Sequence, residues 1–154
     1  MSSSRYTVYH KDEPWTGVRP TTKHIIVHVR NKPHVTTARE LDTDFRRKGF
    51  LCCGYHYVLT GAGVSVMRHP ASIGAGHPDF DETAVYVAIL NYDGKTPVPQ
   101  QLEGPLVSLL NDLSSQYPDA DIISAPSLMK LEGYQPFNDF IGERHARRRP
   151  STNK

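Results

Sequence analysis

Two histidines on one predicted strand are the first side chains of this sequence that could bind a metal ion or exchange a proton. The segment 23–30 is rich in β-branched residues, which favours a strand. Side chains alternate along a strand, so His24, Ile26 and His28 share one face. His24 lies about 13 Å from His28, too far to share a metal ion. His28 is therefore a candidate metal ligand or pocket acid–base group, and the alternative is a half-buried histidine without a chemical role.

A second group of chemically capable side chains extends from Cys52 to Tyr57. Tyr55 carries a phenol on an apolar segment, which by itself is typical of a core tyrosine with a satisfied hydroxyl. His56 points to the opposite face of the predicted strand, so we expect it to be structural. Cys52 and Cys53 are adjacent, a geometry too strained for a disulfide, and they indicate reduced, partly buried residues of a cytosolic protein.

The 154 residues carry a formal net charge of +2 and suit one compact domain with its own core. No apolar run approaches the roughly 18 residues that cross a bilayer, and the first residues lack the apolar region of a secretory signal. These features predict a cytoplasmic protein without a membrane partner. We expect an N-terminal arm at 1–21, a folded domain at 22–140 and a basic C-terminal tail at 141–154.

Hydrophobic periodicity predicts the elements that position these residues. Strands are expected at 23–30, 54–59, 64–68, 83–90 and 121–124, with a hairpin turn at 60–63 and the strand at 83–90 in the centre. One helix lies between a capping box at Thr37 and Glu40 and a stop at Gly49. A leucine-lined helix follows at 100–117, where Gly104-Pro105 either kinks it or marks its start. The region 125–140 is expected to be irregular, with or without one short helix. The order predicts one α/β domain with a central mixed sheet flanked by helices.

Five motifs give the sequence a resemblance to a known family. They are Ile25-Ile26-Val27-His28, Gly54-Tyr55-His56-Tyr57, Val64 with Arg68, Gly74-Ala75-Gly76-His77, and the leucine-rich helix ending in Ser115-Gln116-Tyr117. In this order, over residues 22–140, they resemble the type-2 N-acetylmuramoyl-L-alanine amidases, which include small phage lysozymes and the peptidoglycan recognition proteins. The resemblance implies the same fold, His28 as a zinc ligand, Tyr55 as an oxyanion-stabilising catalytic group, and Tyr55, His77 and Arg68 as ligand contacts.

The zinc site that the resemblance implies is incomplete. Its second ligand, a histidine, would fall near Pro126, and its third, a cysteine, would fall near Tyr134 or Gln135. The sequence contains no histidine or cysteine between Pro78 and Arg144. A catalytic zinc needs three protein ligands, and a lone imidazole cannot retain the ion at cellular concentrations. We therefore expect no zinc cofactor, unless other side chains have been recruited as ligands.

Three functions follow as hypotheses. The first is a catalytically degenerate amidase-fold protein that acts by binding, as in a phage-type regulatory or inhibitory contact with a protein partner, or by binding peptidoglycan fragments. The second is an active N-acetylmuramoyl-L-alanine amidase with a rebuilt zinc site that includes His28. The third is a nucleic-acid contact through the basic segment from Arg144 to Lys154, which carries no acidic residue.

Overall fold

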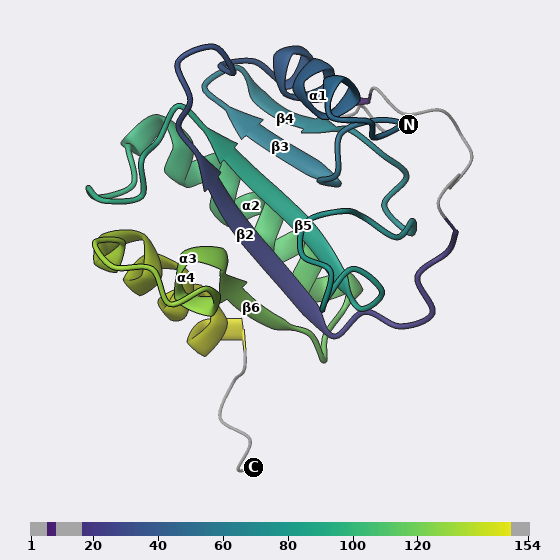
Figure 1. Cartoon of the computed structure of the whole chain (residues 1–154). Coiled ribbons are helices and arrows are strands. Elements are labelled where there is room, and N and C mark those ends of the chain that lie inside the picture. Colours follow the sequence, from purple (N-terminus) through teal and green to yellow (C-terminus); the bar gives the residue numbers. More distant parts are fainter. Residues whose placement is uncertain (1–5, 9–16, 149–154) are drawn as a thin grey trace.

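The computed structural model describes residues 6–8 and 17–148, which form one mixed sheet with helices on both faces (Figure 1). The elements in chain order are β1 (Tyr6–Val8), β2 (His24–Arg30), α1 (Ala38–Arg47), β3 (Tyr57–Thr60), β4 (Gly63–Val66), β5 (Ala84–Leu90), α2 (Gln100–Gln116), β6 (Asp121–Ser124), α3 (Ala125–Leu128) and α4 (Gln135–Arg148). The expected α/β architecture is confirmed. In this part of the chain no helix has the length and apolarity that a bilayer crossing requires.

The sheet has the strand order β1-β4-β3-β5-β2-β6, and every pair is parallel except the β3–β4 hairpin. β5 has neighbours on both sides and all seven of its residues are buried. Its continuous run of apolar residues is typical of a strand that is covered on both faces. The predictions of a hairpin and of a central strand near 83–90 are therefore confirmed.

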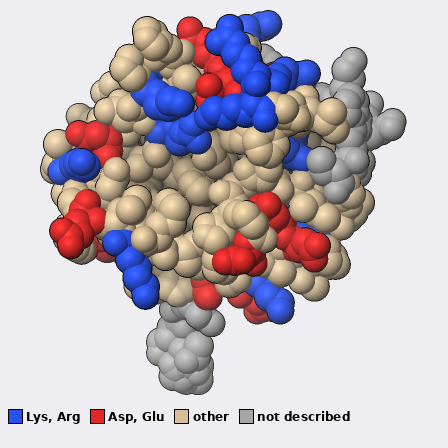
Figure 2. Space-filling model, viewed as in Figure 1, with Lys and Arg blue, Asp and Glu red and all other residues tan. Residues whose placement is uncertain are grey.

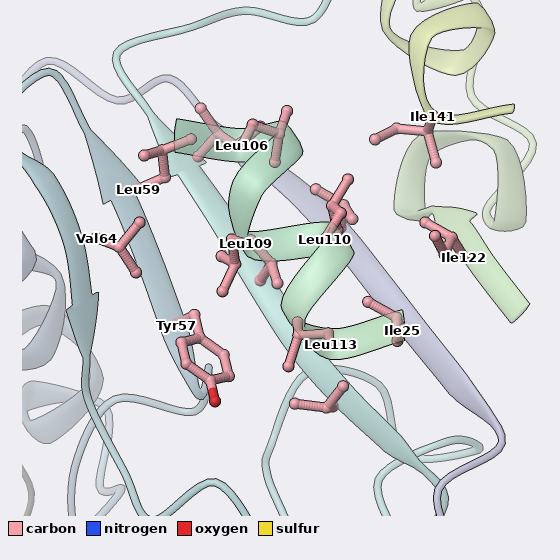
Figure 3. Packing of buried hydrophobic residues seen from close by; sticks show 14 of the residues in the cluster. Ile25, Tyr57, Leu59, Val64, Leu106, Leu109, Leu110, Leu113, Ile122 and Ile141 are labelled. Carbon is pink, nitrogen blue, oxygen red and sulfur yellow. The ribbon is translucent and has the colours of Figure 1, made fainter. Parts of the chain in front are cut away.

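One face of the sheet packs against α2 and α4, and it holds the larger core. Leucines of α2 contact the sheet residues Ile25, Leu59 and Val64, as Figure 3 shows. The helical spacing of these leucines places all of them on the side that faces the sheet: Leu102, Leu106, Leu109, Leu110 and Leu113. The helix begins at Gln100 and contains Pro105, so the alternative of a start at Gly104-Pro105 is wrong.

The other face carries α1, α3 and the long connection from β4 to β5. Helix α1 begins with the predicted capping box, since Thr37 accepts a hydrogen bond from the Glu40 amide and Glu40 accepts one from the Thr37 amide. Leu41 and Phe45 of α1 are buried against this face. The sheet residues beneath include the small Ala84 and Ala88, and Ala88 pairs with His28 in the β2–β5 register.

Two expected boundaries were wrong. The segment expected as a strand at 54–59 becomes regular only at Tyr57, because Gly54 lies against the neighbouring connection, where an added Cβ would stand 2.5 Å from the Ala75 carbonyl oxygen. The region expected to be irregular to residue 140 ends in α4, which continues to Arg148. Phe137 and Ile141 of α4 are buried in the core, so the expected boundary at 140/141 falls inside a packed helix.

The expected N-terminal arm at 1–21 also contributes to the domain. Within it, β1 pairs in parallel with β4, and the Tyr6 hydroxyl donates a hydrogen bond of 2.5 Å to Asp112 of α2. Arg19 is buried. Residues 1–5, 9–16 and 149–154, which include the end of the expected basic tail, lie outside the described residues.

Candidate functional site

His28 lies near the carboxyl end of β2, on the sheet face that carries α1 and α3. Its residue surface is 7 % exposed, and its ring centroid lies 4.8 Å from that of Tyr55 and 5.6 Å from that of Tyr86. Its Nε2 atom is buried and has no hydrogen-bond partner among the described residues. Burial, together with smaller contributions from the nearby charges of Arg30 and His77, lowers the pKa of His28 to about 4. The imidazole is therefore neutral at physiological pH.

Tyr55 lies beside His28, and its hydroxyl is hydrogen-bonded to Arg30, which follows His28 on β2. Tyr55 is 4 % exposed, and its hydroxyl accepts a hydrogen bond of 2.9 Å from Nη1 of Arg30. The Arg30 guanidinium lies 5.9 Å from the centroid of the Tyr55 ring. Burial raises the pKa of Tyr55, which keeps the phenol protonated. We call the group formed by His28, Arg30 and Tyr55 the His28 site.

A basic cluster borders the His28 site on the side of α1. Arg30, Lys32 and Lys48 surround the carboxylate of Asp44, at N–O distances of 3.8, 3.7 and 3.1 Å, respectively. One carboxylate cannot neutralise three cations, so the cluster keeps a net positive charge. Figure 2 shows Lys and Arg side chains gathered beside α1, along the border of a hollowed area without charged side chains.

His77 lies in the Gly-rich connection on the same side of the sheet, and a buried hydroxyl holds its backbone. The Tyr86 hydroxyl donates a hydrogen bond of 2.6 Å to Asp81 and accepts one of 3.1 Å from the His77 amide. The Asp81 carboxylate also accepts hydrogen bonds from the amides of Gly76 and His77. The close packing of Gly76 on Tyr86, where an added Cβ would lie 2.6 Å from the ring, leaves space for no larger residue. The connection is therefore fixed on β5.

His56 and Arg19 form a buried network beneath the first part of the same connection. Nδ1 of His56 accepts a hydrogen bond of 3.0 Å from the Tyr86 amide, which places the ring proton on Nε2, where it is donated to the Ser72 carbonyl at 2.8 Å. Burial, together with smaller contributions from the charges of Arg19 and Arg68, lowers the pKa of His56 to about 3. Arg19 donates to the carbonyls of Pro70 and Ser72 and to the hydroxyl of Tyr117. These contacts agree with the structural role expected for His56.

Arg68 has different contacts from those expected of a ligand-binding residue. It is 6 % exposed, and its guanidinium donates hydrogen bonds to the Ser72 hydroxyl and to the carbonyls of Cys53 and Ile73. These bonds hold the connection against the segment before β3, so Arg68 is not included in the His28 site. Burial raises the pKa of Cys53 to about 12, so this thiol stays protonated and fits the packing role expected for it.

The described residues do not match a three-ligand zinc site. Pro126, at the expected second position, is a buried residue of α3 with no donor atom in its side chain. The expected third position falls near Tyr134 or Gln135. The Lys95 ammonium lies 5.4 Å from the centroid of the Tyr134 ring, and Gln135 donates a hydrogen bond to Asp139 in α4. In residues 6–8 and 17–148, no three His, Cys, Asp or Glu side chains are close enough together to bind a metal ion. His28 is thus the one position of the expected ligand set that carries a suitable side chain.

The structure therefore brings His28, Tyr55 and His77 to the same region, and it adds Arg30, which sequence reasoning missed. A signal was available, because Arg30 follows His28 by two residues on one strand and must lie on the same face. Arg144, the first cation of the expected basic tail, stacks on Phe140 and pairs with Glu143. It lines a separate cavity of about 500 Å³ between α2 and α4, together with both acidic and basic side chains.

No protein-family model matches the sequence, and no curated protein sequence matches it. Solved structures do match. The endolysin of the Thermus scotoductus bacteriophage Ph2119 aligns with a TM-score of 0.71 at 18% identity, over 90% of this chain and 98% of the endolysin. Drosophila PGRP-LB aligns with a TM-score of 0.67 at 17% identity, over 78% and 79% of the two chains. The N-acetylmuramoyl-L-alanine amidase LysC from Clostridium intestinale aligns with a TM-score of 0.63 at 18% identity, over 77% and 81%. This chain therefore has the fold shared by N-acetylmuramoyl-L-alanine amidases, endolysins and peptidoglycan recognition proteins.

Proposed function

We propose that the protein binds peptidoglycan fragments at the His28 site and does not cleave them by zinc-amidase chemistry. The observation that carries the proposal is the donor set. Of the three expected positions, His28 carries a histidine, Pro126 replaces the second histidine, and Tyr134 or Gln135 replaces the cysteine. A single imidazole retains zinc too weakly to activate water, because a catalytic site needs three protein ligands.

The choice of ligand is supported by the proteins that share this fold. Their names describe an endolysin, an N-acetylmuramoyl-L-alanine amidase and a peptidoglycan recognition protein. Two of these names refer to enzymes and one to recognition, so the fold itself is compatible with binding or with cleavage. The buried Nε2 atom of His28, which lacks a partner among the described residues, favours an occupant with hydrogen-bonding groups.

One set of measurements separates binding from cleavage. Purified protein is incubated with insoluble peptidoglycan, the bound fraction is measured by co-sedimentation, and released stem peptides are identified by mass spectrometry. The metal content of the same preparation is measured by elemental analysis. We expect co-sedimentation, a zinc content well below one ion per chain, and no released peptide.

The His28→Ala variant sharpens this comparison. If the protein is an amidase with a rebuilt metal site, the wild-type chain will contain stoichiometric zinc and release peptide, and His28→Ala will lose both. That result would refute the binding proposal. An exposed histidine provides the matched control, because His34→Ala removes an imidazole from an exposed position that is not part of the His28 site.

A protein partner is a second candidate function, and exposed apolar side chains favour it. Phe50 and Leu51 follow α1, Met129 and Leu131 follow α3, and each is 45 to 59 % exposed. We would test this candidate with a purified partner identified by cross-linking in cells of the native host. Leu51→Lys should then abolish its binding and leave co-sedimentation with peptidoglycan unchanged. Retention of partner binding by both Leu51→Lys and Met129→Lys would refute a role for these side chains.

A further inference from the structure

The guanidinium of Arg30 has more hydrogen-bonding capacity than its described neighbours use. Its five N–H groups make one hydrogen bond within residues 6–8 and 17–148, the bond to Tyr55. The Asp44 carboxylate lies 3.8 Å away, beyond hydrogen-bonding distance, and is held more closely by Lys48 at 3.1 Å. The Arg30 side chain is 23 % exposed. The guanidinium can therefore bind a second anion without giving up either neighbour.

The hydroxyl proton of Tyr55 is also a hydrogen-bond donor that the described residues do not use. Its oxygen accepts a hydrogen bond from Arg30, and no acceptor for its own proton is found in the described part of the chain. A phenol carries its proton at neutral pH, so the O–H group is available as a donor. A buried donor without an acceptor costs free energy, which a ligand oxygen would recover.

His28 adds a further unsatisfied polar group beside these two. Its Nε2 atom is buried without a partner, and its ring lies 4.8 Å from Tyr55. A protein core rarely leaves such an atom unpaired unless an ion, a water molecule or a ligand completes the site.

We propose that Arg30 and Tyr55, next to His28, form a binding site for a carboxylate of the peptidoglycan stem peptide. The planar fork of a guanidinium matches the two oxygens of a carboxylate, and the phenol O–H supplies another donor at the same place. Lys32 and Lys48 at the border would attract an acidic peptide by their charge. This inference rests on the proposed function and names the chemical group that the site selects.

A pair of soluble probes tests the inference. The first is N-acetylmuramoyl-L-alanyl-γ-D-glutamyl-L-lysine with its two backbone carboxylates free, and the second is the same compound with both converted to carboxamides. Affinities are measured by isothermal titration calorimetry for the wild-type chain, Arg30→Gln and Tyr55→Phe. Arg47→Gln is the matched control, since it removes the same charge from an exposed position at the end of α1.

We expect the wild-type chain and Arg47→Gln to bind the free-carboxylate probe about 10- to 100-fold more tightly than the amidated probe, as for a hydrogen bond to a charged group. In Arg30→Gln this preference should fall to about threefold or less, while the affinity for the amidated probe stays within a few-fold of wild type. In Tyr55→Phe the preference should fall by a smaller factor, because the phenol donor is neutral. Circular dichroism and Tm report whether each variant is folded.

The failures are distinguishable. If neither probe binds the wild-type chain and co-sedimentation is also absent, the proposed function is wrong and the inference fails with it. If both probes bind equally, the protein binds the fragment without reading a carboxylate, and the inference alone is overturned. It is also overturned if folded Arg30→Gln keeps the full preference. Should Arg30→Gln be unfolded, Tyr55→Phe and Arg30→Lys decide in its place, and an unchanged preference in both would overturn the proposal.

Discussion

The neutral His56 makes a quantitative prediction about the stability of the protein in mild acid. Its pKa is about 3 in the folded chain, against about 6.5 for an unfolded histidine. Between these values the unfolded chain binds a proton that the folded chain does not. Protons therefore favour unfolding, and the stability present above pH 6.5 is lost progressively as the pH falls toward 3.

The size of the effect follows from the displacement of the pKa. At pH 5 the unfolded histidine is almost fully protonated, and the cost to folding is about 2 kcal/mol for His56. His28, with a folded pKa of about 4, adds a similar cost of about 2 kcal/mol at the same pH. Their sum of about 4 kcal/mol is a large part of the roughly 5–15 kcal/mol that stabilises a typical domain.

The assay is urea unfolding followed by circular dichroism at pH 7.5 and pH 5.0. The wild-type chain should lose about 4 kcal/mol between these conditions through the two histidines. His56→Asn preserves an acceptor for the Tyr86 amide but cannot be protonated, so its loss should be smaller by about 2 kcal/mol. The exposed His34 provides the control, and His34→Asn should show the wild-type pH dependence.

The comparison is robust to other titrating groups, since carboxylates contribute to the pH dependence of every variant. The result that would refute the reasoning is an equal loss of stability in wild type and His56→Asn. Nitrogen NMR provides a direct check, because the ring should carry its proton on Nε2 at both pH values. A doubly protonated ring in the folded chain at pH 5 would contradict the assigned hydrogen bonds.

Three further substitutions test the fold. Thr37→Ala removes the cap of α1 and should cost about 1 kcal/mol in urea unfolding, and a cost near zero would show that the bond to the Glu40 amide contributes nothing. Gly54→Ala places a methyl group 2.5 Å from the Ala75 carbonyl oxygen and should lower stability by about 3 kcal/mol, whereas an unchanged Tm would contradict this packing. Phe137→Ala opens a cavity under α4 and should cost about 3–5 kcal/mol, and a cost below about 1 kcal/mol would mean that α4 does not pack on the sheet.

Matched variants keep these comparisons interpretable. Thr37→Ser retains a hydroxyl acceptor for the helix amide and should preserve most of the stability that Thr37→Ala loses. Gly61→Ala adds the same methyl group as Gly54→Ala at a position with no atom within 4 Å and with an ordinary backbone angle, so it should be tolerated.

Local patterns predicted the elements whose signals are contained in a short window. The capping box at Thr37, the leucine face of α2 and the uninterrupted apolar run of β5 are each visible within a single short stretch of the sequence. The extension of α4 to Arg148 was missed although Phe137, Phe140 and Ile141 have helical spacing, because polar residues and a proline dilute the pattern.

The candidate site shows why the remaining features could not be predicted. The face of His28 and the position of Tyr55 follow from strand alternation and from the family resemblance, and the structure places their rings together. The role of Arg19 depends on His56, Ser72 and Tyr117, which are distant in sequence and meet only in the folded sheet. The hydrogen bonds of Arg68 to the carbonyls of Cys53 and Ile73 could not be predicted either, because a sequence motif gives the residue type but not its partners.

The position of β2 between β5 and β6 has a consequence for synthesis on the ribosome. His24 pairs with Asp121, and Ile25 with Ile122, so one edge of β2 is completed by residues that are translated roughly 100 positions later, or about 5–20 s at typical elongation rates. Throughout that interval the nascent chain carries an apolar strand whose backbone amides and carbonyls on that edge have no partner, a condition that favours aggregation. Stalling translation before residue 121 should therefore yield a chain that requires a chaperone, while release after α4 should yield one that does not.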